Sequence, residues 1–298
     1  MSEPEQTKQE QVRVVLDERV RLTTAVLAAS HWPSMEQAIE PHAVHTQGKL
    51  TRQFMAENDW ANHPAVARVN EALANGVDLE TVFTAVLCGG WRDFALLEEP
   101  PAPFTAVWLA ELADLAANSD IGTALWAEHR DVWDEALTDL NAIYKDAALA
   151  DFLARLTGKT LDRPVLIVPT LVFPMLAGVP ATTSEAHFAI VPPPKAWGES
   201  PPWPYRDGAD WALGEACRVL TVHLLADEVA ALTDAQVHLL RHAAATIFLG
   251  EALSESEGMS YLVRARRQFK LPQLAAVVEQ LRAWLERRDV PLAAVLVD

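Results

Sequence analysis

Hydrophobic positions in the first half of the chain recur mainly at intervals of three and four residues, a spacing typical of helices. Residues 64–87 show it on both sides of Asn75-Gly76, where a turn would separate two helices. Further helices are expected over 105–117 and, as one long region, over 124–156. The pattern predicts a mostly helical N-terminal half.

Three stretches rich in β-branched residues predict strands instead: residues 11–16, 164–173 and 186–191. Pro169 interrupts the second stretch, which favours an edge position or a bulge. The proline-rich residues 192–204 can form neither a helix nor an inner strand, so we expect a rigid loop there.

Helical spacing returns after this loop. Helices are expected over 209–229, 234–253, 256–269 and 273–288, and the apolar residues 291–297 are a candidate for a final strand. The elements together predict an α+β fold that is mostly α.

The change of pattern near residue 161 suggests how the chain is organised. We expect a disordered tail over 1–10, a mostly helical part over 11–160 and an α/β part over 161–298. The last two parts are expected to form one compact unit.

Charge and composition limit the classes of partner that the protein can bind. The 298 residues include 24 basic and 41 acidic side chains, for a net charge of −17. This excess repels nucleic acid and anionic membrane surfaces. The sequence shows neither an apolar signal segment at its start nor a run long enough to span a bilayer. We expect a cytoplasmic protein whose partners are proteins or peptides.

Metal ligands are the first candidate chemistry. His223 and Asp227 are four residues apart within the predicted helix 209–229, so they would share one face, and His242 on the next helix would add a second imidazole. Two imidazoles and a carboxylate suit Zn²⁺ or a similar divalent ion. Ordinary solvated histidines are the alternative interpretation, because motifs this short recur by chance.

The order of elements, with strands and a proline-rich loop before a helix that carries spaced ligands, resembles uncharacterised bacterial zincin-like (gluzincin-like) proteins. The segments that carry the resemblance are VRVVLDERVRLTTAVL (12–27), HPAVARVNEAL (63–73), the β-rich stretch, LRHAAATIFLGEAL (240–253) and the amphipathic C-terminal helix. The resemblance implies a zincin-like core, a small sheet with a motif helix, behind a helical N-terminal half.

The motif itself departs from the family. An active zincin carries HExxH, whereas the five residues here are HLLAD, with Leu224 where the general base would be and Asp227 in place of the second histidine. The resemblance implies a third ligand on the following helix, which would fall near His242, with Glu251 as the other candidate. The resemblance therefore implies a catalytically impaired domain, because a hydrocarbon side chain cannot accept a proton from water.

The resemblance also implies a peptide groove. Strand 186–191 would be the edge that pairs with an extended peptide, and the groove would include His187, Phe188, Trp197 and Trp203. We therefore expect a domain that binds a protein or peptide. Two alternatives stay open: a metal-dependent hydrolase that uses His223, Asp227 and His242, and a helical interaction protein without an active site.

Overall fold

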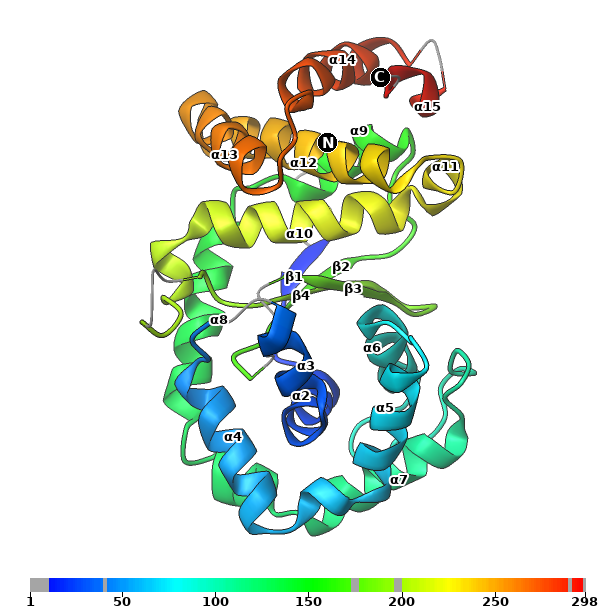
Figure 1. The fold of residues 1–298 in the computed structure, drawn as a ribbon, viewed down its shortest axis with the longest axis vertical. Coiled ribbons are helices and arrows are strands. Elements are labelled where there is room, and N and C mark those ends of the chain that lie inside the picture. The colour runs from blue at the N-terminus through cyan, green and yellow to red at the C-terminus, as the bar shows by residue number, and fades with distance from the viewer. Residues whose placement is uncertain (1–10, 40–41, 173–176, 196–199, 289–290, 297–298) are drawn as a thin grey trace, which may run out of the picture.

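Two layers of helices enclose a small sheet (Figure 1). The structure is a computed structural model, and it describes residues 11–39, 42–172, 177–195, 200–288 and 291–296. Most described residues are helical, so the predicted α+β class, mostly α, is confirmed at that level. The predicted tail over 1–10 lies outside the described residues.

The sheet has four strands in the spatial order β1-β2-β4-β3. Their bounds are Val12–Val14 (β1), Val165–Pro169 (β2), Val179–Thr182 (β3) and His187–Val191 (β4). β1, β2 and β4 are parallel, whereas β3 is antiparallel to β4. β1 comes from the first residues described and β2 from more than 150 residues later, so the sheet joins the two halves of the chain.

Each face of the sheet contributes to a different hydrophobic core. Along β2, the side chains of Val165 and Ile167 enter one core, whereas Val168 enters the other. β4 repeats the alternation, because Ala189 packs with the first core and Phe188 with the second. Successive side chains of a strand point to opposite faces. A sheet buried on both faces therefore reads as a continuous apolar run, as these two strands do.

One face is covered by helices of the first half of the chain. They are α2 (Glu18–Ala29), α3 (Trp32–Ile39), α4 (Thr46–Glu57), α5 (Pro64–Ala74), α6 (Leu79–Leu87) and α7 (Ala106–Asn118). Figure 1 shows α4, α5, α6 and α7 arranged around α2, which is buried along most of its length. Thr23 and Thr24 of α2 are fully buried, and each hydroxyl donates to a backbone carbonyl of its own helix, at 2.9 and 2.7 Å.

The other face is covered by a stack of helices from the second half. α10 (Ala209–Leu224) lies on the sheet, α12 (Asp234–Ala252) packs on α10, and α13 (Glu255–Gln268) and α14 (Leu274–Arg287) pack on α12 (Figure 1). The remaining helices of this side are α8 (Arg130–Tyr144), which contacts β1 and β2, α9 (Leu149–Thr157), α11 (Ala226–Val229) and α15 (Leu292–Val295).

Several predicted elements are corrected. The long helix expected over 124–156 is a π-helix, η2 (Ile121–Trp126), followed by α8 and α9. Residues 292–295 form the helix α15, so the final strand expected over 291–297 was wrong. The short strand β3 was not predicted. The two helices expected on either side of Asn75-Gly76 are confirmed as α5 and α6, with Gly76 at φ 82°.

A buried cation connects the two cores. Arg21 of α2 is 7% exposed, and its guanidinium carbon lies 4.2 Å from the ring centroid of Trp126 and 4.4 Å from that of Trp133. Trp126 belongs to one core and Trp133 to the other. Burial lowers the pKa of Arg21 to about 10, so the side chain keeps its charge at neutral pH. The aromatic faces stabilise this charge where water is excluded.

Replacing Arg21 with alanine removes both ring contacts and leaves a cavity between the cores. We expect Arg21→Ala to lower the free energy of unfolding by about 2–4 kcal/mol in urea denaturation. The matched control is Arg52→Ala on the exposed side of α4, for which we expect a change below about 0.5 kcal/mol. Equal losses in the two variants would contradict the role given to Arg21.

Candidate functional site

The structure separates the predicted metal ligands. His223 lies in the last turn of α10, where its Nδ1 is 2.8 Å from Oε1 of Glu80 on α6. α10 ends at Leu224, and Asp227 lies exposed on the separate short helix α11. The helix predicted over 209–229 is therefore interrupted at Leu225, between His223 and Asp227.

His242 lies away from this helix end, inside the stack of α10, α12 and α13. It is 1% exposed, and its Nδ1 is 2.7 Å from the hydroxyl of Tyr261 on α13. Across the described ranges, no three His, Cys, Asp or Glu side chains are grouped closely enough to hold a metal ion. The described residues thus give the predicted Zn²⁺ no ligand set.

His223 belongs instead to a polar cluster that links both helical layers to the sheet. Its ring centroid lies 5.8 Å from that of His187, the first residue of β4. The Nε2 of His187 is 3.2 Å from Oδ1 of Asp162, and its Nδ1 is 3.2 Å from the hydroxyl of Thr182 on β3. Burial lowers the pKa of His187, so this imidazole is neutral at pH 7. The cluster ties α6, α10 and the sheet together.

The predicted peptide groove is also corrected. Strand β4 is paired on both sides, with β2 and β3, so it is not an edge. His187 and Phe188 are buried within it, at 4% and 2% exposure. Trp203 is 41% exposed and lines a small pocket of about 120 Å³ with His45, whereas Trp197 lies outside the described residues.

The edge beside β4 is β3, and its outward donors are already occupied. The N–H of Gly178, just before the strand, donates to Oε2 of Glu215 on α10 at 2.6 Å, and the N–H of Thr182 donates to the hydroxyl of Thr84 at 3.4 Å. Pro180, which faces the same way because backbone groups alternate along a strand, has no N–H. Proline and side-chain caps are common protections of edge strands, so β3 has no free donor for a further strand.

The opposite edge, β1, is open. The N–H of Val165 donates to the carbonyl of Gln11 at 2.7 Å, and the N–H of Val15 donates to the carbonyl of Ile167 at 3.0 Å. Since residues 11 and 15 face β2, the alternation of a parallel ladder turns the N–H and C=O of Val12 and Val14 away from it. No hydrogen bond to another described segment takes up these four groups.

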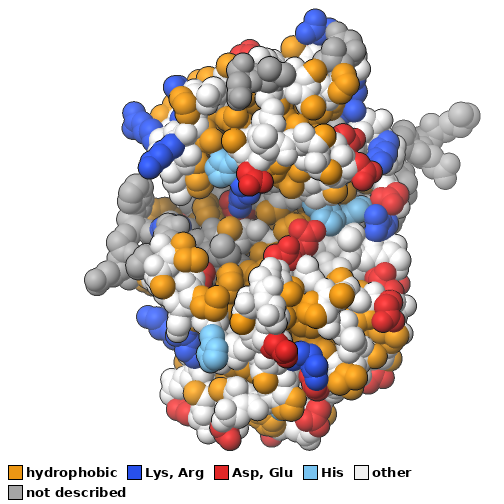
Figure 2. Space-filling model, turned by 45° about the vertical axis from the view of Figure 1, so that its right-hand side comes forward, with side chains coloured by type: hydrophobic (Ala, Val, Ile, Leu, Met, Phe, Trp, Pro, Cys, Tyr) orange, Lys and Arg blue, Asp and Glu red, His pale blue; other side chains and the backbone are white. Residues whose placement is uncertain are grey.

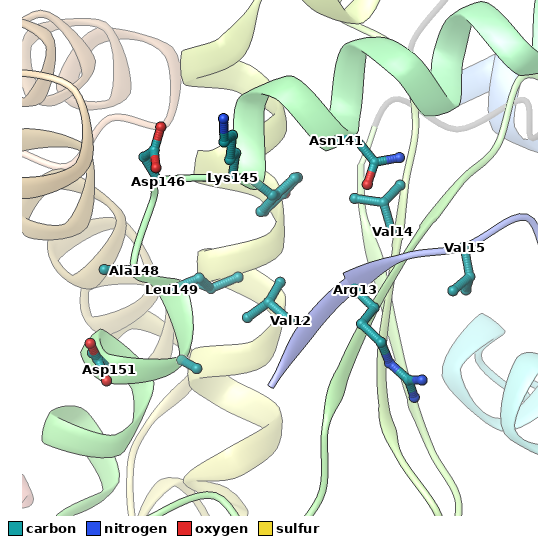
Figure 3. Close-up of a pocket in the computed structure, with 12 residues that line it drawn as sticks. Val12, Arg13, Val14, Val15, Asn141, Lys145, Asp146, Ala148, Leu149 and Asp151 are labelled. Carbon is teal, nitrogen blue, oxygen red and sulfur yellow. The ribbon is translucent and has the colours of Figure 1, made fainter. Parts of the chain in front are cut away.

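A pocket lies along this open edge (Figure 3). Its volume is about 670 Å³, within the range typical of ligand sites. One wall is Val12–Val15, and the other comes from the end of α8, the turn after it and the start of α9. Its polar lining consists of Arg13, Asn141, Tyr144, Lys145, Asp146 and Asp151. Figure 3 shows the Arg13 side chain directed away from the α8–α9 wall, so the charged side chains on that wall are Lys145, Asp146 and Asp151.

Figure 2 shows a hollow between the upper and lower halves of the molecule. Hydrophobic side chains line much of it, and charged and histidine side chains gather along its border.

Both cysteine thiols are buried, and burial raises the pKa of the Cys88 thiol to about 11. Neither thiol is therefore ionised at neutral pH, as a cysteine nucleophile must be.

The sequence predicted part of the open-edge pocket. It placed a strand at 11–16, which supplies one wall. The other wall forms where the predicted helix 124–156 breaks near Ala148, which has φ 48°. No glycine or proline marks this break in the sequence. The pocket itself is therefore a product of the tertiary structure.

The comparisons with known proteins found nothing similar. No protein-family model matches the chain, and neither a curated protein nor a solved structure matches it with significance. The zincin resemblance stays a prediction. Within the described ranges no helix is long and apolar enough to cross a bilayer.

The buried imidazole of His242 predicts a pH dependence of stability. Burial, and then the nearby Arg218, His238 and Arg241, lower its pKa from 6.5 to about 2. The unfolded chain therefore binds a proton below pH 6.5 that the folded chain does not bind, and stability falls as the pH falls from 6.5 towards 2. Between pH 7 and pH 5 this residue alone lowers the free energy of unfolding by about 2 kcal/mol.

In urea unfolding, we expect the free energy of unfolding of His242→Gln to fall less between pH 7 and pH 5 than that of the wild type. The exposed His31→Gln is the matched control and should keep the wild-type dependence. If His242→Gln keeps the wild-type dependence as well, His242 is not buried as a neutral base.

Proposed function

We propose that the protein binds an extended peptide segment of another protein at the open edge of β1, and that its zincin-like core does not hydrolyse peptides. The observation that carries the proposal is the set of four outward backbone groups of Val12 and Val14 beside a pocket of about 670 Å³. An added strand would form main-chain hydrogen bonds with these groups, and pockets beside the edge would select its side chains.

The weak charge of the pocket favours a polypeptide ligand. The charged side chains of its helical wall are Lys145, Asp146 and Asp151, so backbone pairing and apolar contact would hold the ligand, more than net charge. Val12 and Val14 already pack against the hydrophobic core on one face of the sheet. Side chains of an added strand that point to the same face would extend this apolar surface.

The length of the edge favours one short segment over a second copy of the chain. β1 has three residues, and only Val12 and Val14 direct their backbone N–H and C=O groups outward. The helical wall from Asn141 to Asp151 lines the same pocket. Continuous sheets between two copies would need a longer unobstructed edge, because two outward residues supply few ladder bonds. The occupant is therefore a segment that is unfolded before it binds.

The zincin-like part of the proposal rests on the layout of the second half. A mixed sheet with an antiparallel strand at one edge precedes α10, which packs across that sheet. In place of ligands, the middle of α10 presents Glu215 to this strand, and Arg218 pairs with Glu215 at 2.5 Å. A carboxylate held by a guanidinium and a backbone N–H is poorly placed to take a proton from water.

The backbone pairing can be tested at Val14. A proline there removes one outward N–H but none of the bonds to β2, and Pro180 shows that this sheet already holds a proline facing outward from an edge. Against the best binder from a displayed library of random octapeptides, we expect Val14→Pro to weaken affinity roughly tenfold by calorimetry.

Val14→Ala is the matched control, because it shortens the side chain and keeps the N–H. We expect it to bind within about threefold of wild type. Unfolding curves of both variants establish that each is folded. An octapeptide that binds Val14→Pro as tightly as Val14→Ala would place the ligand elsewhere.

The absence of peptidase activity is tested separately. We expect no turnover of a broad peptide library above that of a buffer blank, with Zn²⁺ added or with a chelator. Turnover that the chelator abolishes would overturn the inactive-core part of the proposal and leave the strand-addition part untouched.

A further inference from the structure

A group of basic and aromatic side chains lies inside the helical stack, on a different part of the molecule from the pocket at β1. We call it the arginine–histidine cluster, and it consists of Glu215, Arg218, His238, Arg241, His242 and Tyr261. α10, α12 and α13 each contribute to it. Glu215 also caps β3 and pairs with Arg218, whereas the other four residues have no part in the proposed function.

The cluster carries an uncompensated positive charge. Glu215 is buried and pairs with Arg218, which cancels one guanidinium. Arg241 forms no ion pair with a described residue, and its Nη2 lies 2.6 Å from Nδ1 of His238. Since a guanidinium can only donate, Nδ1 of His238 accepts this hydrogen bond and the proton of its neutral ring lies on Nε2. The charge of Arg241 is thus left without a counterion.

Two further donors of the cluster are buried without a partner. The Nε of Arg241 and the Nε2 of His242 form no hydrogen bond with any described residue. Burial raises the pKa of the Tyr261 phenol, which keeps a proton that it can donate to Nδ1 of His242, and in that tautomer Nε2 carries the imidazole proton. A buried N–H without an acceptor is costly, and most buried donors in proteins are satisfied. The cluster therefore lacks an acceptor.

We propose that the arginine–histidine cluster binds a small oxyanion, a carboxylate or phosphate group, that accepts from Arg241 and His242. Charge-assisted hydrogen bonds from a guanidinium are the usual way in which proteins hold these groups. A bound oxyanion would neutralise the charge of Arg241 and supply the acceptor that the unpartnered donors lack.

A cation is the alternative that the spacing alone would suggest. His238 and His242 are four residues apart on α12, and such a pair is a common metal clamp. Here Arg241 lies between them in sequence and occupies Nδ1 of His238, and Arg218 lies nearby. Two guanidinium groups repel a divalent cation and attract an anion.

The rim of the cluster is partly exposed. His238 and Arg241 are half-buried, and Phe269, whose ring centroid lies 4.4 Å from that of His242, is 39% exposed. Nε of Arg241 and Nε2 of His242 are themselves buried, so an oxyanion reaches them only when the side chains at this rim move. The chain as a whole is strongly acidic and repels anions, whereas this positively charged cluster attracts them.

Calorimetry on the full chain tests the site, with inorganic phosphate in one arm and succinate in the other, at constant ionic strength in chloride. We expect saturable binding of one equivalent in at least one arm, and the tighter arm identifies the group. Arg241→Gln should weaken it at least roughly tenfold, because it removes the charge and the Nε donor. Arg264→Gln is the matched control, since Arg264 is an exposed arginine of α13 that pairs with Asp210.

A second readout does not depend on the stability of Arg241→Gln. In the wild type, the imidazole nitrogen resonances of His242 should shift as phosphate or succinate saturates, whereas those of the exposed His31 should not. Heats that rise linearly with concentration in both arms, or equal affinity in the two arginine variants, would overturn the proposal. Stoichiometric Zn²⁺ binding that His238→Asn abolishes would overturn it as well, in favour of a cation site.

Discussion

Burial of the sheet on both faces is the constraint on which the rest of the structure depends. The strands have three to five residues, too few to be stable alone, and the two inner strands, β2 and β4, gain their stability by placing side chains in both cores. The helices of the first half and those of the second half therefore cannot fold onto the sheet independently of each other. Arg21, held between Trp126 and Trp133, is the point where the two cores meet through one side chain.

A sheet covered on both faces can act only at its edges. The two edges here differ in how their backbone groups are satisfied. At β3, Glu215 and Thr84 occupy the outward donors and Pro180 has none to offer. At β1, the outward N–H and C=O groups of Val12 and Val14 bond to no other described segment, and they lie beside a pocket large enough for a ligand. This asymmetry favours β1 as the candidate peptide site, whereas the strand that the zincin resemblance implies, β4, is paired on both sides.

The candidate histidines also lie in different surroundings. Histidines that the sequence grouped as ligands of one ion belong to two separate clusters. His223 pairs with Glu80 and lies beside His187, at the junction of both layers and the sheet. His242 lies among arginines, where a cation is disfavoured and an anion is favoured. In each cluster the charges of the neighbouring side chains, more than the histidines themselves, decide which chemistry is available.

The sequence by itself determined the α+β class, the positions of three strands, most helices of the second half and the turn at Asn75-Gly76, because apolar spacing and turn residues act locally. It did not reveal that α10 ends at Leu224, that β4 is interior or that the helix after Trp133 breaks near Ala148. Only the tertiary structure decided which strand edge is left open and which charges surround each histidine. Both depend on contacts between residues far apart in the chain, such as Val165 with Gln11 and His223 with Glu80, and no local pattern encodes them.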